Sequence, residues 1–193
     1  IALGAESVLE LPTSNAKLVD LLTDLDDPPA AGVLIGVVGG SGGVGATTLS
    51  CALAQGAAGS GRAMVVDTDP LGPGLDRLLG MDDQPGVRWN DLQDTEGRLG
   101  SRMLRDCVPR AAGFGSAGPG VLTWSPGQVS VSPGVLRETL AAARRGHDMV
   151  VLDLARHAST TIELISRCDV VFVVARASVA GLASAMRLVS SMG

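Results

Sequence analysis

The sequence predicts an α/β domain built on a doubly wound, mostly parallel β-sheet. Short, continuous apolar runs alternate along the chain with segments in which apolar residues recur every three or four positions. Strands buried on both faces of a parallel sheet produce such runs, and the helices that connect them produce such segments. The length of 193 residues suits one domain of this kind with a short additional piece.

Strands and helices are expected in alternation from residue 33 onward. The expected buried strands are 33–38, 63–66, 149–154 and 170–175, with a weaker one at 121–124. The expected helices are 47–58, 74–79, 133–145, a short one opened by Thr160, and 182–189. Ser132 is predicted to cap the helix that starts at Pro133 and stops at Gly146, and Thr160 with Glu163 is predicted to form a capping box.

The residues ahead of this domain have a different organisation. Residues 1–26 are expected to form a separate piece, with a strand at 8–11 and a helix marked by leucines at helical spacing, Leu18, Leu21, Leu22 and Leu25. Residues 27–32 contain two prolines and are interpreted as a linker, which leaves 33–193 as the main domain. The chain starts at Ile1 and stops at Gly193 within a helical pattern, so we expect a piece of a longer protein, truncated at the C-terminus of this domain.

Composition excludes several classes of protein. The formal net charge of −5 disfavours a protein that coats duplex DNA, and two Trp, two Phe and no Tyr are too few to build a base-stacking surface. Cys51, Cys107 and Cys168 are widely spaced, which predicts neither a disulfide framework nor a zinc site. No apolar run reaches the ~18 residues of a membrane-spanning helix. We therefore expect a cytoplasmic protein with no direct nucleic-acid signal and no membrane segment in this chain.

The segment 86–120 is polar and rich in glycine, and it carries no clear strand or helix pattern. Arg98, Arg102 and Arg105 fall at helical spacing and would form a basic stripe if this part were helical. We interpret that stripe as a solvated face rather than as a binding surface.

A glycine-rich segment lies directly between the first expected strand and the first expected helix, with the sequence GGSGGVGATT at positions 39–48. Clustered glycines allow consecutive backbone N–H groups to point to one side, and a helix N-terminus adds partial positive charge. This arrangement of strand, loop and helix predicts a phosphate-binding site.

Two nucleotide-binding templates compete for this loop. The spacing Gly40-x-Gly42-x-x-Gly45, followed by Asp67 at the end of the second expected strand, matches the NAD-binding fingerprint. A P-loop requires lysine where this chain has Ala46. On spacing alone, the nicotinamide cofactor is favoured.

The surrounding residues favour a triphosphate with a metal ion. Thr47 and Thr48 lie where a P-loop places its Mg²⁺-binding hydroxyl. Asp67, Asp69 and Asp153 follow two expected strands, and three acids at one phosphate-binding edge suit a metal–triphosphate site.

Taken together, the motifs at 41–48, Asp67-x-Asp69-Pro70 and Asp148-x4-Asp153 resemble the MinD/ParA superfamily of deviant Walker A ATPases, which belongs to the SIMIBI class of P-loop NTPases. The segments 86–92 and 153–156 are similar to the CpaE/TadZ branch, and most of all to actinobacterial septum site-determining (Ssd) proteins. The resemblance covers residue 33 to the end. Residues 1–26 look like the tail of the receiver-like domain that such proteins carry upstream.

The resemblance implies an ATP and Mg²⁺ site with specific residue roles. Thr47, Asp67 and Asp153 would hold the metal, and Asp69 would orient the attacking water if hydrolysis occurs; an Asp-Pro turn is an equally good interpretation of Asp69. Backbone amides of the loop would bind the phosphates, namely those of Gly42, Gly43, Val44, Gly45, Ala46, Thr47 and Thr48.

The departures from the superfamily pattern predict weak catalysis. Ser41 replaces the signature lysine and Ala46 replaces the P-loop lysine. A lysine beside phosphate contributes on the order of a few kcal/mol, and most in the transition state. We therefore expect weakened ATP binding with slow or absent hydrolysis. Arg156, or Arg176 after the next expected strand, is a candidate for the missing positive charge.

By resemblance, the function is that of an ATP-binding, weakly or non-hydrolysing positioning factor in septum site determination or in Flp/Tad pilus localisation. Its partners would be cell-division or pilus-assembly proteins, a homodimer remains open, and the protein would be recruited from the cytoplasm to septum or pole. The alternatives are an active ParA-type partitioning ATPase, an NAD-binding Rossmann oxidoreductase, and a scaffold without nucleotide.

Overall fold

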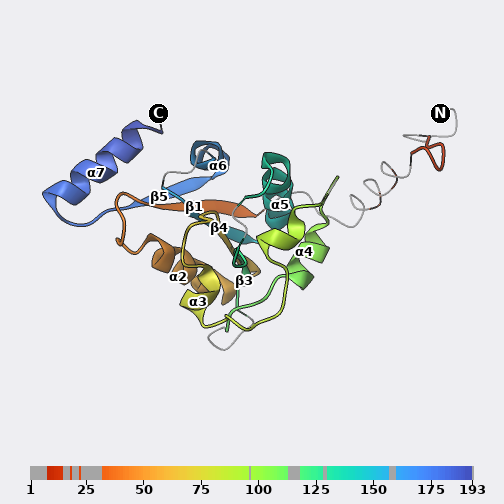
Figure 1. Ribbon diagram of the computed structural model, residues 1–193, viewed down its shortest axis with the longest axis horizontal. Helices are drawn as coiled ribbons and strands as arrows, with labels where there is room; N and C mark the ends of the chain where they lie inside the picture. The colour runs from red at the N-terminus through yellow and green to blue at the C-terminus, as the bar shows by residue number, and fades with distance from the viewer. Residues whose placement is uncertain are drawn as a thin grey trace.

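The fold is a single five-stranded parallel sheet covered by helices (Figure 1). The computed structural model describes residues 8–14, 18, 22, 32–95, 97–112, 118–127, 130–156 and 160–192. The strands are β1 (Val33–Gly39), β2 (Ala63–Asp67), β3 (Gly120–Leu122), β4 (Met149–Leu154) and β5 (Val170–Val174). They lie in the order β3-β2-β4-β1-β5, and every pairing is parallel. The α/β class and the parallel, doubly wound sheet are confirmed.

Helices cover both faces of the sheet. Successive strand residues point to opposite faces, so Leu34 and Val38 join one apolar core whereas Ile35 and Val37 join the other. Helices α2 and α3 lie on one side, and α5 and α6 on the other (Figure 1). The helices are α2 (Ala46–Ala58), α3 (Leu75–Leu79), a 3₁₀ turn η1 (Trp89–Leu92), α4 (Ser101–Cys107), α5 (Pro133–Gly146), α6 (Thr161–Arg167) and α7 (Val179–Ser190).

The carboxyl ends of the central strands meet at one edge of the sheet. The register of β2 with β4 pairs Asp67 with Asp153, and β1 ends at Gly39, where the glycine-rich segment begins. This edge therefore collects the acids and the loop that the sequence singled out, as expected for a parallel α/β sheet.

One predicted helix cap is confirmed and one is wrong. The Ser132 hydroxyl accepts a hydrogen bond from the Val135 amide at 3.1 Å, and α5 runs one residue further than expected, through Gly146. Thr160 precedes α6 but makes no side-chain cap. Thr160 has helical backbone angles (φ −81°, ψ −13°) rather than the extended backbone of a capping residue. Its predicted partner Glu163 instead forms ion pairs, with its Oε1 3.1 Å from Arg167 Nη2 and 3.6 Å from Arg137 Nη1.

Strand β5 was expected to be buried, and this expectation is wrong. Val170 and Phe172 are 46% and 42% exposed. Their side chains share the sheet face with Ile35 and Val37, where α2 packs over the three inner strands β1, β2 and β4. An edge strand beyond the reach of that helix keeps one face open to solvent.

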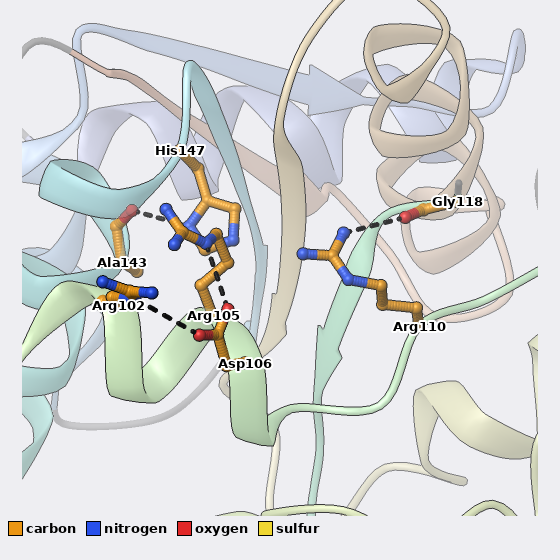
Figure 2. Close-up of polar contacts among 7 residues, drawn as sticks. All are labelled: Arg102, Arg105, Asp106, Arg110, Gly118, Ala143 and His147. Atoms are coloured by element: carbon orange, nitrogen blue, oxygen red, sulfur yellow. Dashed lines mark hydrogen bonds and ion pairs between the residues drawn. The ribbon is translucent and has the colours of Figure 1, made fainter. Parts of the chain in front are cut away.

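The basic stripe that was expected if residues 98–105 were helical forms only in part. Helix α4 starts at Ser101, so Arg98 precedes it. Arg102 and Arg105 both pair with the same acid, Asp106, at 3.8 and 3.3 Å (Figure 2). Shared pairing with one exposed carboxylate is typical of a solvated helix face.

The N-terminal segment is described only in part. Residues 8–10 form no strand and 11–14 form a turn, so the strand expected at 8–11 is wrong. Most of the expected helix and linker lies outside the described residues, and the domain division at 1–26, 27–32 and 33–193 stays a prediction.

None of the helices that the structure describes is long and apolar enough to span a membrane. The three cysteines are free; Cys51 is buried and Cys107 is exposed.

Candidate nucleotide-binding site

The glycine loop forms a wall of an open pocket of about 440 Å³ at the carboxyl end of β1. This volume lies in the range of small-molecule sites. The residues that line it are Gly39, Ser41, Gly42, Gly43, Val44, Gly45, Ala46, Thr47, Thr48, Asp69, Leu154 and Arg156. The structure thus brings the predicted phosphate-binding residues 42–48 together with Asp69 and Arg156 in one pocket.

The loop has a backbone suited to holding an anion. Gly43 and Gly45 have φ angles of +68° and +91°, which L-residues with a side chain rarely adopt. A Cβ atom added at Gly42, Gly43 or Gly45 would meet nothing within 4 Å, so this side of the loop is open. Helix α2 starts at Ala46 with no acid in its first turn. Its free N-terminal amides and the turned loop fit a phosphate group.

Asp153 lies beneath the loop at the end of β4. It is 6% exposed, and burial raises the pKa of its carboxyl, while hydrogen bonds from Thr47 and Ser50 oppose that rise. The Ser50 hydroxyl lies 3.0 Å from the Asp153 Oδ1 and 3.0 Å from the Ala46 carbonyl. Because a hydroxyl has one proton, Ser50 donates to one of these acceptors at a time.

Asp67 is the register partner of Asp153 and is buried more deeply. It is 3% exposed, and burial raises the pKa of its carboxyl from 3.8 to about 7. Its Oδ2 accepts a hydrogen bond from the Thr123 hydroxyl at 2.8 Å, and its Oδ1 accepts one from the Asp69 amide at 3.0 Å. The Trp89 indole N–H donates to the Asp67 carbonyl at 2.7 Å. These contacts fix the end of β2.

The acids do not form a complete metal site by themselves. No group of three His, Cys, Asp or Glu side chains within the described ranges is arranged to hold a metal ion. The oxygens of Thr47, Asp67 and Asp153 are nevertheless the type that Mg²⁺ prefers, and Mg²⁺ commonly completes its shell with phosphate oxygens and water. Thr47 lines the pocket, whereas Asp67 and Asp153 do not, so the two acids fit a Mg²⁺ site as acceptors for its water ligands.

Asp69 has features of both the turn-forming residue and the water-orienting residue that the sequence allowed. Its Oδ1 accepts a hydrogen bond from the Leu71 amide at 3.1 Å, and its carbonyl accepts one from Gly72 at 3.0 Å, so it shapes a turn. It also lines the pocket. The turn holds Asp69 at the mouth of the site.

Arg156 supplies positive charge to the pocket wall. Among the described residues that line the pocket, it is the only Lys or Arg. Its Nη2 donates to the Ser184 hydroxyl at 2.8 Å, and its Nε is buried with no hydrogen-bond partner. Arg176 is exposed and does not line this pocket. Ser41 and Ala46 lie in the wall without any charge.

The strand order decides between the two nucleotide templates. In the dinucleotide-binding fold the second strand lies beside the first, whereas here β4 lies between β1 and β2. Asp67 is also absent from the residues that line the pocket. It is therefore not placed to bind a ribose, and the NAD interpretation is wrong.

Solved structures share this architecture. The ParA family ATPase of Chlorobium tepidum superposes with a TM-score of 0.68 at 19% identity, over 83% of this chain and 68% of that one. MinD of Pyrococcus horikoshii, solved with Mg-ADP, gives 0.61 at 17% identity, over 83% and 64%. The fold is that of the MinD/ParA ATPases. A MinC:MinD complex of Aquifex aeolicus gives 0.64 at 18% identity, over 83% and 63%.

Sequence comparison finds relatives of greater identity. Two uncharacterized proteins of Mycobacterium tuberculosis, from strains CDC 1551 and H37Rv, are each 34% identical over 200 residues. The match covers 96% of this chain and 55% of each relative, so the chain spans about half the length of these curated relatives. No protein-family model matches the chain. The CpaE/TadZ branch and the likeness to Ssd proteins stay predictions.

Several residues of the site were missed by sequence reasoning. Ser50 lies one helical turn after Ala46, a spacing that indicates a shared helix face but does not identify Asp153 as its partner. Thr68 donates to the Asp153 carbonyl at 2.8 Å and ties β2 to β4. Thr123, Trp89 and Ser184 come from distant segments, and no local pattern connects them with the loop.

Proposed function

We propose that the chain is an ATP-binding, weakly or non-hydrolysing positioning factor of the MinD/ParA superfamily. One observation carries the proposal: an open glycine loop at the end of β1 forms a pocket wall that contains no lysine. The loop amides are suited to bind phosphates in the ground state. Catalysis of phosphoryl transfer depends on cations that stabilise developing charge, and Arg156 is the one cationic side chain among the described residues that line the pocket.

Specific residues would hold the nucleotide and its metal. The amides from Gly42 to Thr48 would bind the phosphates, and Thr47, Asp67 and Asp153 would hold Mg²⁺ directly or through water. Bound Mg²⁺ supplies neutralising charge to the phosphates. Asp69 would orient water if any hydrolysis occurs, and Arg156 would replace part of the charge of the two absent lysines.

The cellular role proposed is placement of a partner, in septum site determination or in Flp/Tad pilus localisation. The solved MinC:MinD complex, described as a cell division protein complex, supports the first of these through its shared fold. Partners would be cell-division or pilus-assembly proteins, and nucleotide-dependent pairing with a second copy fits the fold. We further propose that residues 1–26 are the end of a receiver-like domain.

Phosphate release tests the proposed lack of hydrolysis. The wild type is compared with Ala46→Lys and Ser41→Lys, which restore one superfamily lysine each, and with Asp69→Ala as the inactive control. We expect no Mg²⁺·ATP-dependent release from the wild type above the Asp69→Ala level, and a gain in the lysine variants. Wild-type release equal to that of a lysine-bearing ParA would instead establish an active partitioning-type ATPase.

A further inference from the structure

Helix α7 packs directly against the start of the glycine loop. Gly40 lies so close to α7 that a Cβ added there would be 2.7 Å from the Cβ of Ala185. Leu188, on the same helix, joins the apolar core. Helix α7 therefore contacts the first residues of the loop, although it is far away in sequence.

Ser184, next to Ala185, links this helix to two parts of the pocket. Its hydroxyl donates to the Gly40 carbonyl at 2.6 Å and accepts a hydrogen bond from Arg156 Nη2 at 2.8 Å. A hydroxyl can donate once and accept at the same time, so both bonds coexist. Ser184 thus joins the loop after β1 to the segment after β4.

The Arg156 guanidinium keeps hydrogen-bonding capacity after this contact. A guanidinium has five N–H donors, and the contact with Ser184 uses one nitrogen. Its Nε is buried with no partner, and the side chain lines the pocket formed by the loop. The guanidinium N–H groups that do not bond Ser184 belong to a side chain that lines the pocket, and charged donors of this kind bind anionic oxygens strongly.

We propose that Ser184 is a positioning residue of the nucleotide site: it holds the Arg156 guanidinium against the glycine loop and so links α7 to the pocket. This inference rests on the proposed function, because it assumes that the pocket binds a nucleoside triphosphate. Fixing a flexible arginine before the ligand arrives removes an entropic cost from binding. The same link means that a bound triphosphate stabilises α7.

The test uses the full chain and a calorimetric titration with Mg²⁺·ATP. Ser184→Ala removes the hydroxyl, Ser184→Thr keeps it, and Ser190→Ala is the matched control on the exposed side of the same helix. We expect Ser184→Ala to weaken binding about tenfold, the scale of a hydrogen bond to a charged group. Ser184→Thr should bind within about twofold of the wild type, and Ser190→Ala should bind as the wild type does.

A double-variant comparison separates positioning from simple structural support. If Ser184 acts through Arg156, then Ser184→Ala should add little to the loss caused by Arg156→Ala. If the losses of Mg²⁺·ATP affinity in the two single variants multiply in the double variant, the proposal is overturned. Wild-type affinity in Ser184→Ala would also overturn it. If the wild type binds Mg²⁺·ATP while the variants give either of these results, the positioning role of Ser184 is refuted and the proposed function stands. If the wild type binds no Mg²⁺·ATP, both the positioning role and the proposed function are refuted.

Hydrogen exchange of the wild type gives a readout that does not depend on any variant folding. Mg²⁺·ATP is expected to slow exchange of the amides of α7, compared with the protein alone and with Mg²⁺ alone. Slower exchange in the loop without any change in α7 would overturn the link between them.

Discussion

Asp67 on β2 and Asp153 on β4 are register partners at the carboxyl edge of the sheet, and they are only 3% and 6% exposed. Two neighbouring buried carboxyl groups are costly in the charged form because burial deprives them of water. Hydroxyl donors surround them, with Thr123 on Asp67 and Ser50 on Asp153. The stability of this edge therefore depends on individual hydrogen bonds and on pH.

Ser50→Ala should destabilise the fold. Ser50 is fully buried, and its loss leaves the largely buried Asp153 carboxyl with one donor fewer. We expect a decrease of about 1–2 kcal/mol in the free energy of unfolding, measured by urea denaturation at pH 7. Ser60→Ala is the control, because Ser60 is exposed and makes only a local bond to Ala57. Equal decreases in the free energy of unfolding for Ser50→Ala and Ser60→Ala would contradict the stabilising role of the Ser50 hydrogen bond.

Asp67→Asn should remove a pH dependence of stability. The folded pKa of Asp67 is about 7, above its ordinary value of 3.8, so between these values the folded protein binds a proton that the unfolded chain lacks. Stability from this group therefore falls as pH rises from about 4 to about 7, and it levels off above the folded pKa. Without Mg²⁺, we expect the variant to gain up to about 4 kcal/mol relative to the wild type between pH 4 and pH 8. If the free energies of unfolding of the wild type and Asp67→Asn change in parallel with pH, the raised pKa of Asp67 is refuted.

His147 should give the opposite dependence. It is 2% exposed, its Nδ1 lies 2.9 Å from the Ala143 carbonyl, and burial, with nearby Arg110 and Arg105, lowers its pKa below 6.5 (Figure 2). Below pH 6.5 the unfolded chain binds a proton that the folded protein resists, so stability falls on acidification. We expect His147→Gln to lose less stability than the wild type between pH 7 and pH 5 in thermal unfolding. A steeper loss in the variant would show that the imidazole is charged in the fold.

Gly45→Ala should damage the loop itself. Gly45 has a φ of +91°, and the cost for alanine arises from this backbone angle, since an added Cβ would meet open space. We expect a loss of about 1–2 kcal/mol in stability together with weaker nucleotide binding. Gly56→Ala in the last turn of α2, also in open space but helical, is the control and should preserve stability. If both variants behave alike, the loop does not depend on the left-handed angle.

Much of the fold could be predicted because the signals are local. Apolar runs located the strands, and Ser132 with Pro133 located the start of α5, since a capping side chain acts within its own turn. The glycine loop was predictable for the same reason, because the backbone angle at Gly45 and the following helix are encoded in adjacent residues.

The rest could not be predicted because it depends on how distant segments meet. The insertion of β4 between β1 and β2, which excludes the NAD interpretation, has no signature within either strand. The contact between Trp89 and Asp67 spans 22 residues, and that between Arg156 and Ser184 spans 28. The exposure of Phe172 follows from which strands α2 covers, a property of the assembled sheet rather than of the apolar run.

The most direct measurement of the central claim is a calorimetric titration of the wild-type chain with Mg²⁺·ATP, Mg²⁺·ADP and NADH, read together with its molecular mass in solution. We expect saturable binding of Mg²⁺·ATP by the amide loop without any lysine, and no binding of NADH. Heat changes indistinguishable from dilution for Mg²⁺·ATP and Mg²⁺·ADP would contradict this expectation and leave only the architecture.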